Sequence, residues 1–168
     1  MLYAFALAQF FHQLGMLIWI GGMFFAHFAL RPAANQLFEP PERLPLMLGV
    51  LQRFFPWVWT AIALLWSSGL WIFLGVAQGK MGLWVHLMMG IGLLMTLIFS
   101  FIWFQPFRQL RAAVDQQNWS AGGKALARIR QLIATNLTLG LLTVFIASAG
   151  PGFFAAFLQS ALRSAFNH

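Results

Sequence analysis

Four long apolar runs, separated by short polar or proline-rich segments, dominate the pattern of residues along the chain. The runs cover residues 2–30, 46–77, 83–104 and 131–149. A helix needs about 20 predominantly apolar residues to cross the hydrocarbon core of a bilayer, so each run is long enough to span a membrane. The pattern therefore predicts an all-α fold, a four-helix transmembrane bundle that forms a single membrane domain of residues 1–168.

Proline and glycine positions predict where these helices end. Segment 32–45 contains four prolines and two of the three acidic residues, so we expect a loop there. The third run should end at Gln105-Pro106, and the fourth at the Gly-Pro-Gly sequence of residues 150–152. Residues 153–166 alternate apolar and polar positions at helical spacing, which predicts a C-terminal amphipathic helix lying on the membrane surface.

Composition excludes several classes of function. The chain is 61% hydrophobic and only 8% charged, whereas soluble domains carry about 25% charged residues, so a soluble enzyme is not expected. There is no cysteine, which excludes disulfides, thiolate metal sites, iron–sulfur clusters and cysteine nucleophiles. The net charge of +7 sits at the ends of apolar runs and not along one face, so nucleic acid is not an expected partner.

The basic residues predict the orientation in the membrane, because Lys and Arg are concentrated in cytoplasmic loops. Only Lys80 and Arg163 lie on the side of the two termini. Eight lie on the other side: Arg31, Arg43, Arg53, Arg108, Arg111, Lys124, Arg128 and Arg130. We therefore expect a multi-pass protein of the bacterial inner (cytoplasmic) membrane with both termini periplasmic.

Histidines are the ionisable groups that remain inside the predicted spans, and such groups are candidates for function. His12 lies twenty residues before Pro32, and His86 lies twenty residues before Pro106. The two spans run in the same direction, so both imidazoles should lie at one depth and could ligate a single haem b iron. His27 lies roughly 22 Å deeper than His12, too far for the same metal, and is expected near the cytoplasmic interface.

Small and aromatic neighbours extend this hypothesis to a pocket. Glycines beside both histidines would let a flat macrocycle approach the helix backbone, and a tryptophan would border it. The predicted cofactor site consists of His12, Gly15, Trp19, Gly82, His86 and Gly90, with His12 and His86 as metal ligands. The sequence assigns no catalytic residue.

Two other interpretations of these residues stay open. A membrane histidine can simply form a hydrogen bond across helices. Thioether and imidazole groups together also suit copper(I), and three pairs have the spacing to meet on one helix face: His12 with Met16, Met23 with His27, and His86 with Met89.

A stripe of small and polar residues marks the fourth span. Asn136, Gly140 and Thr143 recur at helical spacing. Such a stripe is typical of close helix packing in membranes, with contact to a quinone headgroup as the alternative.

Several motifs resemble a known family. Segment 12–34, HQLGMLIWIGGMFFAHFALRPAA, together with Arg53-Phe54-Phe55 and Ser68-Gly69-Leu70-Trp71, resembles small bacterial membrane proteins of the copper resistance protein D (CopD) family. Trp84-Val85-His86 and segments 105–110 and 121–130 extend the likeness over nearly the whole chain. The resemblance implies a role in copper uptake or copper tolerance.

A second resemblance concerns the histidines. The first-span histidine with a downstream Trp and Gly, and the histidine after Trp84, are similar to HemJ-type protoporphyrinogen oxidases, whose members are implicated in binding haem b. This likeness maps His12 and His86 onto that family's histidines. The Pro-Arg of that family is replaced here by His27-Phe28, so porphyrinogen oxidation is not expected.

The sequence therefore predicts a haem b-binding inner-membrane protein that transfers electrons within the membrane through a bis-histidine haem. A copper-binding permease or copper-resistance protein and a non-catalytic assembly subunit are the alternatives, and whether the protein is an enzyme stays open. Expected partners are membrane lipids and a quinone or periplasmic redox protein, and the sequence is compatible with a homo-oligomer.

Overall fold

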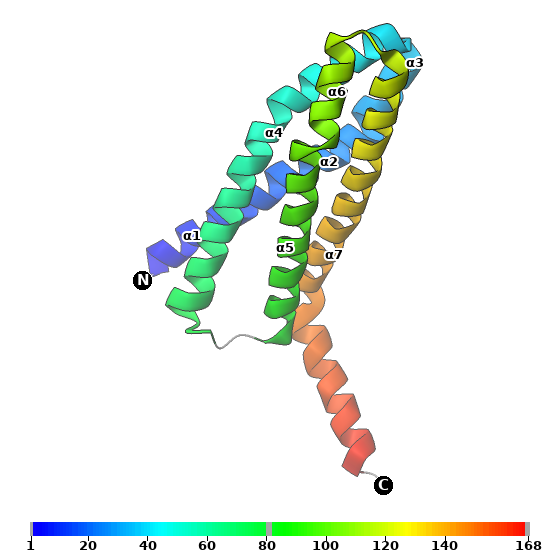
Figure 1. Cartoon of the computed structure of the whole chain (residues 1–168). Coiled ribbons are helices and arrows are strands. Elements are labelled where there is room, and N and C mark those ends of the chain that lie inside the picture. The colour runs from blue at the N-terminus through cyan, green and yellow to red at the C-terminus, as the bar shows by residue number, and fades with distance from the viewer. Residues whose placement is uncertain (1, 80–81, 167–168) are drawn as a thin grey trace.

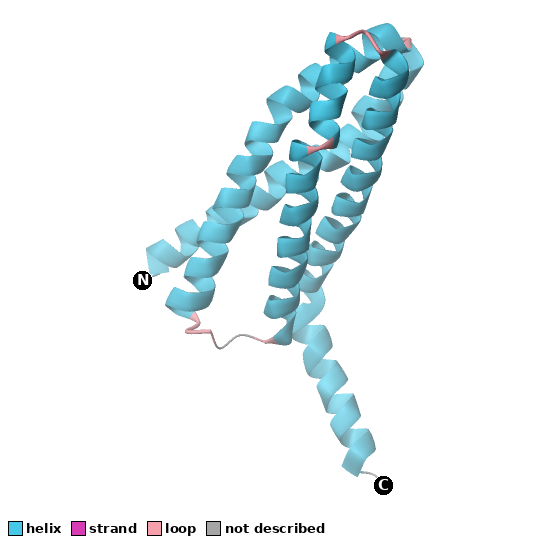
Figure 2. Ribbon diagram, viewed as in Figure 1, coloured by secondary structure: helices cyan, strands magenta, loops and turns pink. Residues whose placement is uncertain are grey.

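The structure, a computed structural model, describes residues 2–79 and 82–166 and is helical almost throughout (Figures 1 and 2). No strand occurs among these residues. Four helical runs are long and apolar enough to cross a membrane: Leu2–Leu37, Pro40–Val76, Leu83–Asp115 and Trp119–Gly150. The predicted all-α architecture with four membrane-spanning helices is confirmed.

Each run is built from consecutive elements, some of them π-helical turns (η). The first run contains α1 (Leu2–Met16), η1 (Leu17–Gly21), α2 (Gly22–Phe25), η2 (Ala26–Leu30) and α3 (Arg31–Leu37). The second contains α4 (Pro40–Leu70) and η3 (Trp71–Val76). The third and fourth contain α5 (Leu83–Phe104), α6 (Pro106–Asp115) and α7 (Trp119–Phe166). The break at Gln105-Pro106 lies where the sequence predicts it, because a residue before proline disfavours helical geometry.

The predicted loop over residues 32–45 is largely wrong. Helix α3 continues to Leu37 and α4 begins at Pro40, so only Phe38 and Glu39 adopt extended conformations between them. Prolines caused the error, because they are tolerated in the first turn of a helix, where a backbone N–H has no intrahelical partner. Pro40 occupies such a starting position, because the preceding Glu39 is extended. Pro32 lies inside the continuous run Leu2–Leu37, just after the π-helical turn η2, and does not end it.

The predicted end of the fourth helix at residues 150–152 is also wrong. Helix α7 continues through Pro151 to Phe166, and Figure 1 shows its last part leaving the direction of the bundle. A proline inside a helix removes one hydrogen bond and bends the helix without having to end it. Residues 153–166 are helical as predicted, but most of their side chains lie outside the described set, so their position on a membrane surface stays a prediction.

The apolar core occupies the half of the bundle that carries α3 and α6. An aromatic cluster lies within it, where the Phe55 ring is 5.2 Å from Phe99 and 4.8 Å from Phe107, measured between centroids. The polar stripe of α7 faces this core: Asn136 is buried, and its Nδ2 donates a hydrogen bond to the Met95 carbonyl at 3.2 Å. These contacts agree with a packing role for the stripe.

The other half of the bundle has no such core. It contains the start of the first span, the end of the fourth span, and the ends of the second and third spans that face each other across their connection. Among the described residues of 2–18, 63–79, 82–94 and 138–150, no hydrophobic side chain is buried. We call these four ranges the open half. Helix α1 packs along α4 and α5 packs along α7, and Figure 1 shows α4 and α5 separating toward this end. Both His12 and His86 lie in the open half.

Candidate functional site

His12 on α1 is held by a serine on α4. Its Nδ1 lies 3.0 Å from the Oγ of Ser68, and the same hydroxyl donates to the backbone carbonyl of Leu64. A serine hydroxyl has one proton to donate, so Oγ accepts a hydrogen bond from Nδ1–H of His12. The neutral imidazole then carries its free lone pair on Nε2.

Two glycines bring α1 and α4 close enough for this contact. A Cβ added to Gly15 would lie 2.9 Å from the Ala61 carbonyl oxygen, and one added to Gly69 would lie 3.2 Å from Cε1 of His12. The structure thus gives Gly15 a role in the packing of α1 against α4, and this packing brings His12 into contact with α4. A contact between Gly15 and a cofactor stays a prediction.

His86 in the first turn of α5 donates from the same ring nitrogen. Its Nδ1 lies 3.3 Å from the carbonyl oxygen of Gly82, the residue that caps the helix. A carbonyl can only accept, so Nδ1 of His86 is the donor, and Nε2 is the ring nitrogen that could bind a metal. The ring stands edge-on against Phe73, with centroids 5.5 Å apart and an interplanar angle of 89°. Gly90, one turn further along α5, is exposed, and an added Cβ would meet nothing within 4 Å.

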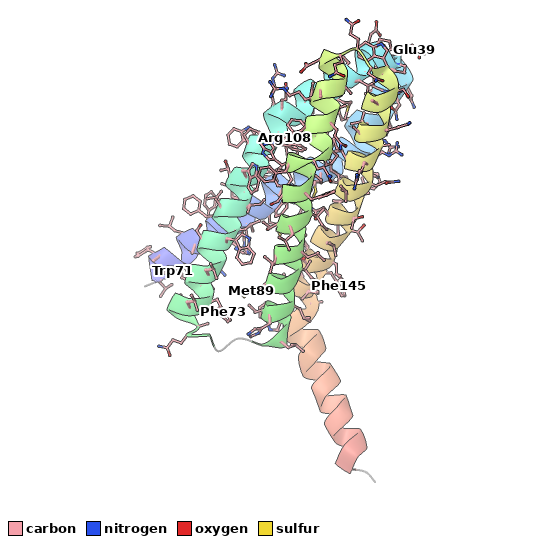
Figure 3. All side chains as sticks on the ribbon, in the orientation of Figure 1. Glu39, Trp71, Phe73, Met89, Arg108 and Phe145 are labelled. Atoms are coloured by element: carbon pink, nitrogen blue, oxygen red, sulfur yellow. The ribbon has the colours of Figure 1, made fainter. Side chains whose placement is uncertain are left out.

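The structure brings each histidine to the end of the second span. His12 contacts Ser68, whereas His86 contacts Phe73, which lies about 7.5 Å further along the helical run because each residue adds 1.5 Å. Figure 3 shows Phe73 and Met89 between the end of this run and α5. No hydrogen bond or ring contact joins the two imidazoles directly among the described side chains.

Trp19, predicted to border a cofactor, is part of the core. It is only 3% exposed, and its ring lies 6.2 Å from that of Phe99. Its position two helical turns from His12 places it where the core gives way to the open half. The structure therefore shows a packing role for Trp19, and contact with a cofactor stays a prediction.

The metal chemistry available to the described residues is limited. They contain no group of three or more His, Cys, Asp or Glu side chains close enough to hold a metal ion. A haem iron does not require such a cluster, because the macrocycle supplies most ligands and the protein supplies only axial ones. Two histidines with free Nε2 atoms are the donor set that suits this cofactor.

Sequence reasoning missed the two residues that orient the histidines, Ser68 and Phe73. A signal for the first was present, because Ser67-Ser68-Gly69 interrupts an otherwise apolar span and polar side chains in membranes commonly bond across helices. Nothing in the sequence distinguishes Phe73 from the many other phenylalanines of the chain.

The family model of copper resistance protein D matches residues 48–149, well over half of the chain. The chain belongs to the CopD family. The predicted family is confirmed, and with the four apolar helices it makes this CopD member a multi-pass membrane protein. The matched region contains Ser68, Phe73 and His86 but not His12. No curated protein and no solved structure gives a significant match, and the similarity to HemJ-type proteins stays a prediction.

Proposed function

We propose that this CopD family member binds one haem b through His12 and His86 and transfers electrons within the membrane. The observation that carries the proposal is the shared state of the two rings: each uses Nδ1 in a hydrogen bond and keeps Nε2 free, within the open half. Histidines that bind metals almost always donate their other ring N–H to a protein acceptor, which fixes the ring orientation and its protonation.

The packing of the bundle supports the same location. Protein interiors are filled by side chains to the density of organic crystals, as in the core half. In the open half, the described side chains include no buried hydrophobic residue, and the four ranges contain no Asp, Glu, Lys or Arg. An apolar macrocycle between the helix pairs α1–α4 and α5–α7 would bury apolar side chains that are only partly buried in the open half.

The residues of the chain would have separate tasks around this cofactor. Haem supplies one-electron redox chemistry when bound. Ser68 holds the Nδ1 proton of His12, and the Gly82 carbonyl holds that of His86. Phe73 restricts rotation of the His86 ring by its edge-on contact. A quinol or a periplasmic redox protein would exchange electrons at the open end.

The visible absorption spectrum of protein purified in mild detergent tests this proposal. We expect a Soret band that shifts on reduction with dithionite and is lost in His12→Ala and in His86→Ala. His27→Ala is the matched control, since His27 is on the same span as His12 but lies outside the open half. Protein that stays colourless after expression with ample haem would contradict the proposal.

Copper(I) binding is the second candidate function, and membership of the CopD family favours it. Met16 and Met89 are half-buried beside His12 and His86, whereas Met23 is buried in the core. Colourless protein that binds copper(I) stoichiometrically, and loses it in Met16→Leu or Met89→Leu, would establish this alternative. Colourless protein that binds neither and copurifies with other subunits would instead favour an assembly role.

We also propose that the protein lies in a bacterial inner membrane with both termini periplasmic. The termini lie at the open end, opposite the connections that carry α3 and α6 (Figure 1), and eight of the ten basic residues belong to the other side. Such an excess of Lys and Arg is typical of cytoplasmic loops. A reporter that is active only in the periplasm should be active when it is fused after His168. If a reporter that is active only in the cytoplasm is active there instead, the proposed orientation is wrong.

A further inference from the structure

A cavity of about 120 Å³ lies in the core half of the bundle, far along the first span from His12. Three segments form it: η2 with α3, the first turns of α4, and the first turns of α7. Arg31, Arg43 and Arg130 line it, one from each segment, together with His27 and Asn35. No Asp or Glu is among its lining residues.

The three arginines are not balanced by the protein around them. All are half-buried, and the Nε of Arg43 is buried without a hydrogen-bond partner. Arg31 and Arg130 line the same cavity and carry like charges, which repel each other unless an anion lies near both. Buried charged donors are unfavourable unless an acceptor satisfies them, so this lining suits an anion.

We propose that the cavity binds the phosphate group of an anionic phospholipid. Guanidinium groups match phosphate oxygens in a bidentate geometry, and three of them from three segments can surround one phosphate. A single water needs roughly a tenth of the cavity volume, so a phosphate group fits. Basic pockets between transmembrane helices recognise lipid headgroups in this way.

The remaining lining favours a lipid over a free anion. Leu44, Met47 and Ile133 provide apolar walls in the same cavity, which suit the glycerol and upper acyl region attached to a phosphate. Arg31 directly follows the apolar residues of the first span, so the cavity lies at the depth where headgroups begin. The bound lipid would tie α3, α4 and α7 together. This site is independent of the proposed haem site, because it uses neither His12 nor His86.

Native mass spectrometry of the full chain in detergent, titrated with phosphatidylglycerol or phosphatidylcholine of equal acyl chains, tests the proposal. We expect one phosphatidylglycerol molecule to bind tightly and phosphatidylcholine to bind more weakly. Each basic residue near an anionic lipid surface contributes about a fivefold preference, so Arg43→Gln and Arg130→Gln should each weaken phosphatidylglycerol binding by at least about fivefold.

Two exposed arginines on the same helices are matched controls. Arg53 on α4 bonds the Gly49 carbonyl, and Arg128 on α7 lies over the Phe101 ring, and neither lines the cavity. Arg53→Gln and Arg128→Gln should change phosphatidylglycerol binding less than about twofold, because water and salt screen exposed charges. Equal effects of cavity and control variants would overturn the proposal, as would equal binding of the two lipids.

A variant that fills the cavity but keeps every charged residue shows whether lipid binding needs the cavity itself or only the positive charge around it. Gly123 lines the cavity, and an added Cβ would meet nothing within 4 Å. Gly123→Leu should therefore fold, fill the cavity and weaken phosphatidylglycerol binding, whereas Gly123→Ala should weaken it much less. If inorganic phosphate alone competes fully with phosphatidylglycerol in the wild type, the site is one for free phosphate and the lipid assignment is wrong.

Discussion

Replacement of Gly15 by alanine is a direct test of the packing that places His12. The added methyl group would lie 2.9 Å from the Ala61 carbonyl oxygen and 3.0 Å from Cγ of Leu65. Contacts below about 3.0 Å to backbone cannot be relieved by rotating a side chain, so α1 must move away from α4. Overpacking of a tight interface costs about 1–3 kcal/mol, which would outweigh the gain of about 0.5–1 kcal/mol from replacing a helical glycine by alanine.

Gly92→Ala is the matched control for this substitution, because Gly92 is not among the residues of the predicted haem site. An alanine at Gly92 meets nothing within 4 Å, so only the helix-propensity gain remains and stability should be unchanged or slightly higher. Thermal unfolding in a fixed detergent, followed by circular dichroism, compares the two variants. Gly15→Ala should lower Tm and also weaken haem retention, since the contact between His12 and Ser68 lies one turn away. Equal Tm values for Gly15→Ala and Gly92→Ala would refute the close α1–α4 contact.

Three further substitutions test other parts of the structure. Ser68→Ala should lower haem affinity about 10- to 100-fold, the usual effect of losing a partner of a metal-binding histidine, and haem titration of the apoprotein would measure it. Phe55→Ala should destabilise the protein by about 3–5 kcal/mol because the ring is 1% exposed, whereas Trp57→Ala, at 60% exposure, should have little effect in the same unfolding assay. Asn136→Leu should be nearly neutral in that assay, because it removes a hydrogen bond worth about 0.6 kcal/mol together with an Oδ1 that is buried without a partner.

Hydropathy predicted the four spans because burial in a bilayer depends on local composition alone. Helix ends were harder to predict, because proline has opposite meanings at different positions. Pro106 marks a break, and a new helix begins at it as expected. Pro40 also begins a helix, but it does so inside the segment where a loop was expected. At Pro151 the helix simply continues. Which of these occurs depends on the turns on either side, which a single proline does not encode.

The candidate site was predicted only in part for a different reason. Counting residues predicts one common depth for His12 and His86, whereas the structure brings them to Ser68 and Phe73, about 7.5 Å apart along the second run. The lateral order of the helices does not follow from counting residues at all. That α1 packs on α4, and so brings His12 to Ser68, follows from close approach at Gly15 and Gly69. The same limit applies to the basic cavity. The number of arginines predicts an orientation, but the convergence of Arg31, Arg43 and Arg130 requires three segments to be placed in space.

The spin state of the iron in purified protein, measured by electron paramagnetic resonance, tests the central proposal most directly. We expect one haem per chain with the low-spin ferric signal of two axial histidines. Either His12→Ala or His86→Ala should convert this signal to high spin or remove the haem, whereas His27→Ala should leave it unchanged. A low-spin signal that survives both of the first two substitutions would contradict the assignment of these histidines as the axial ligands.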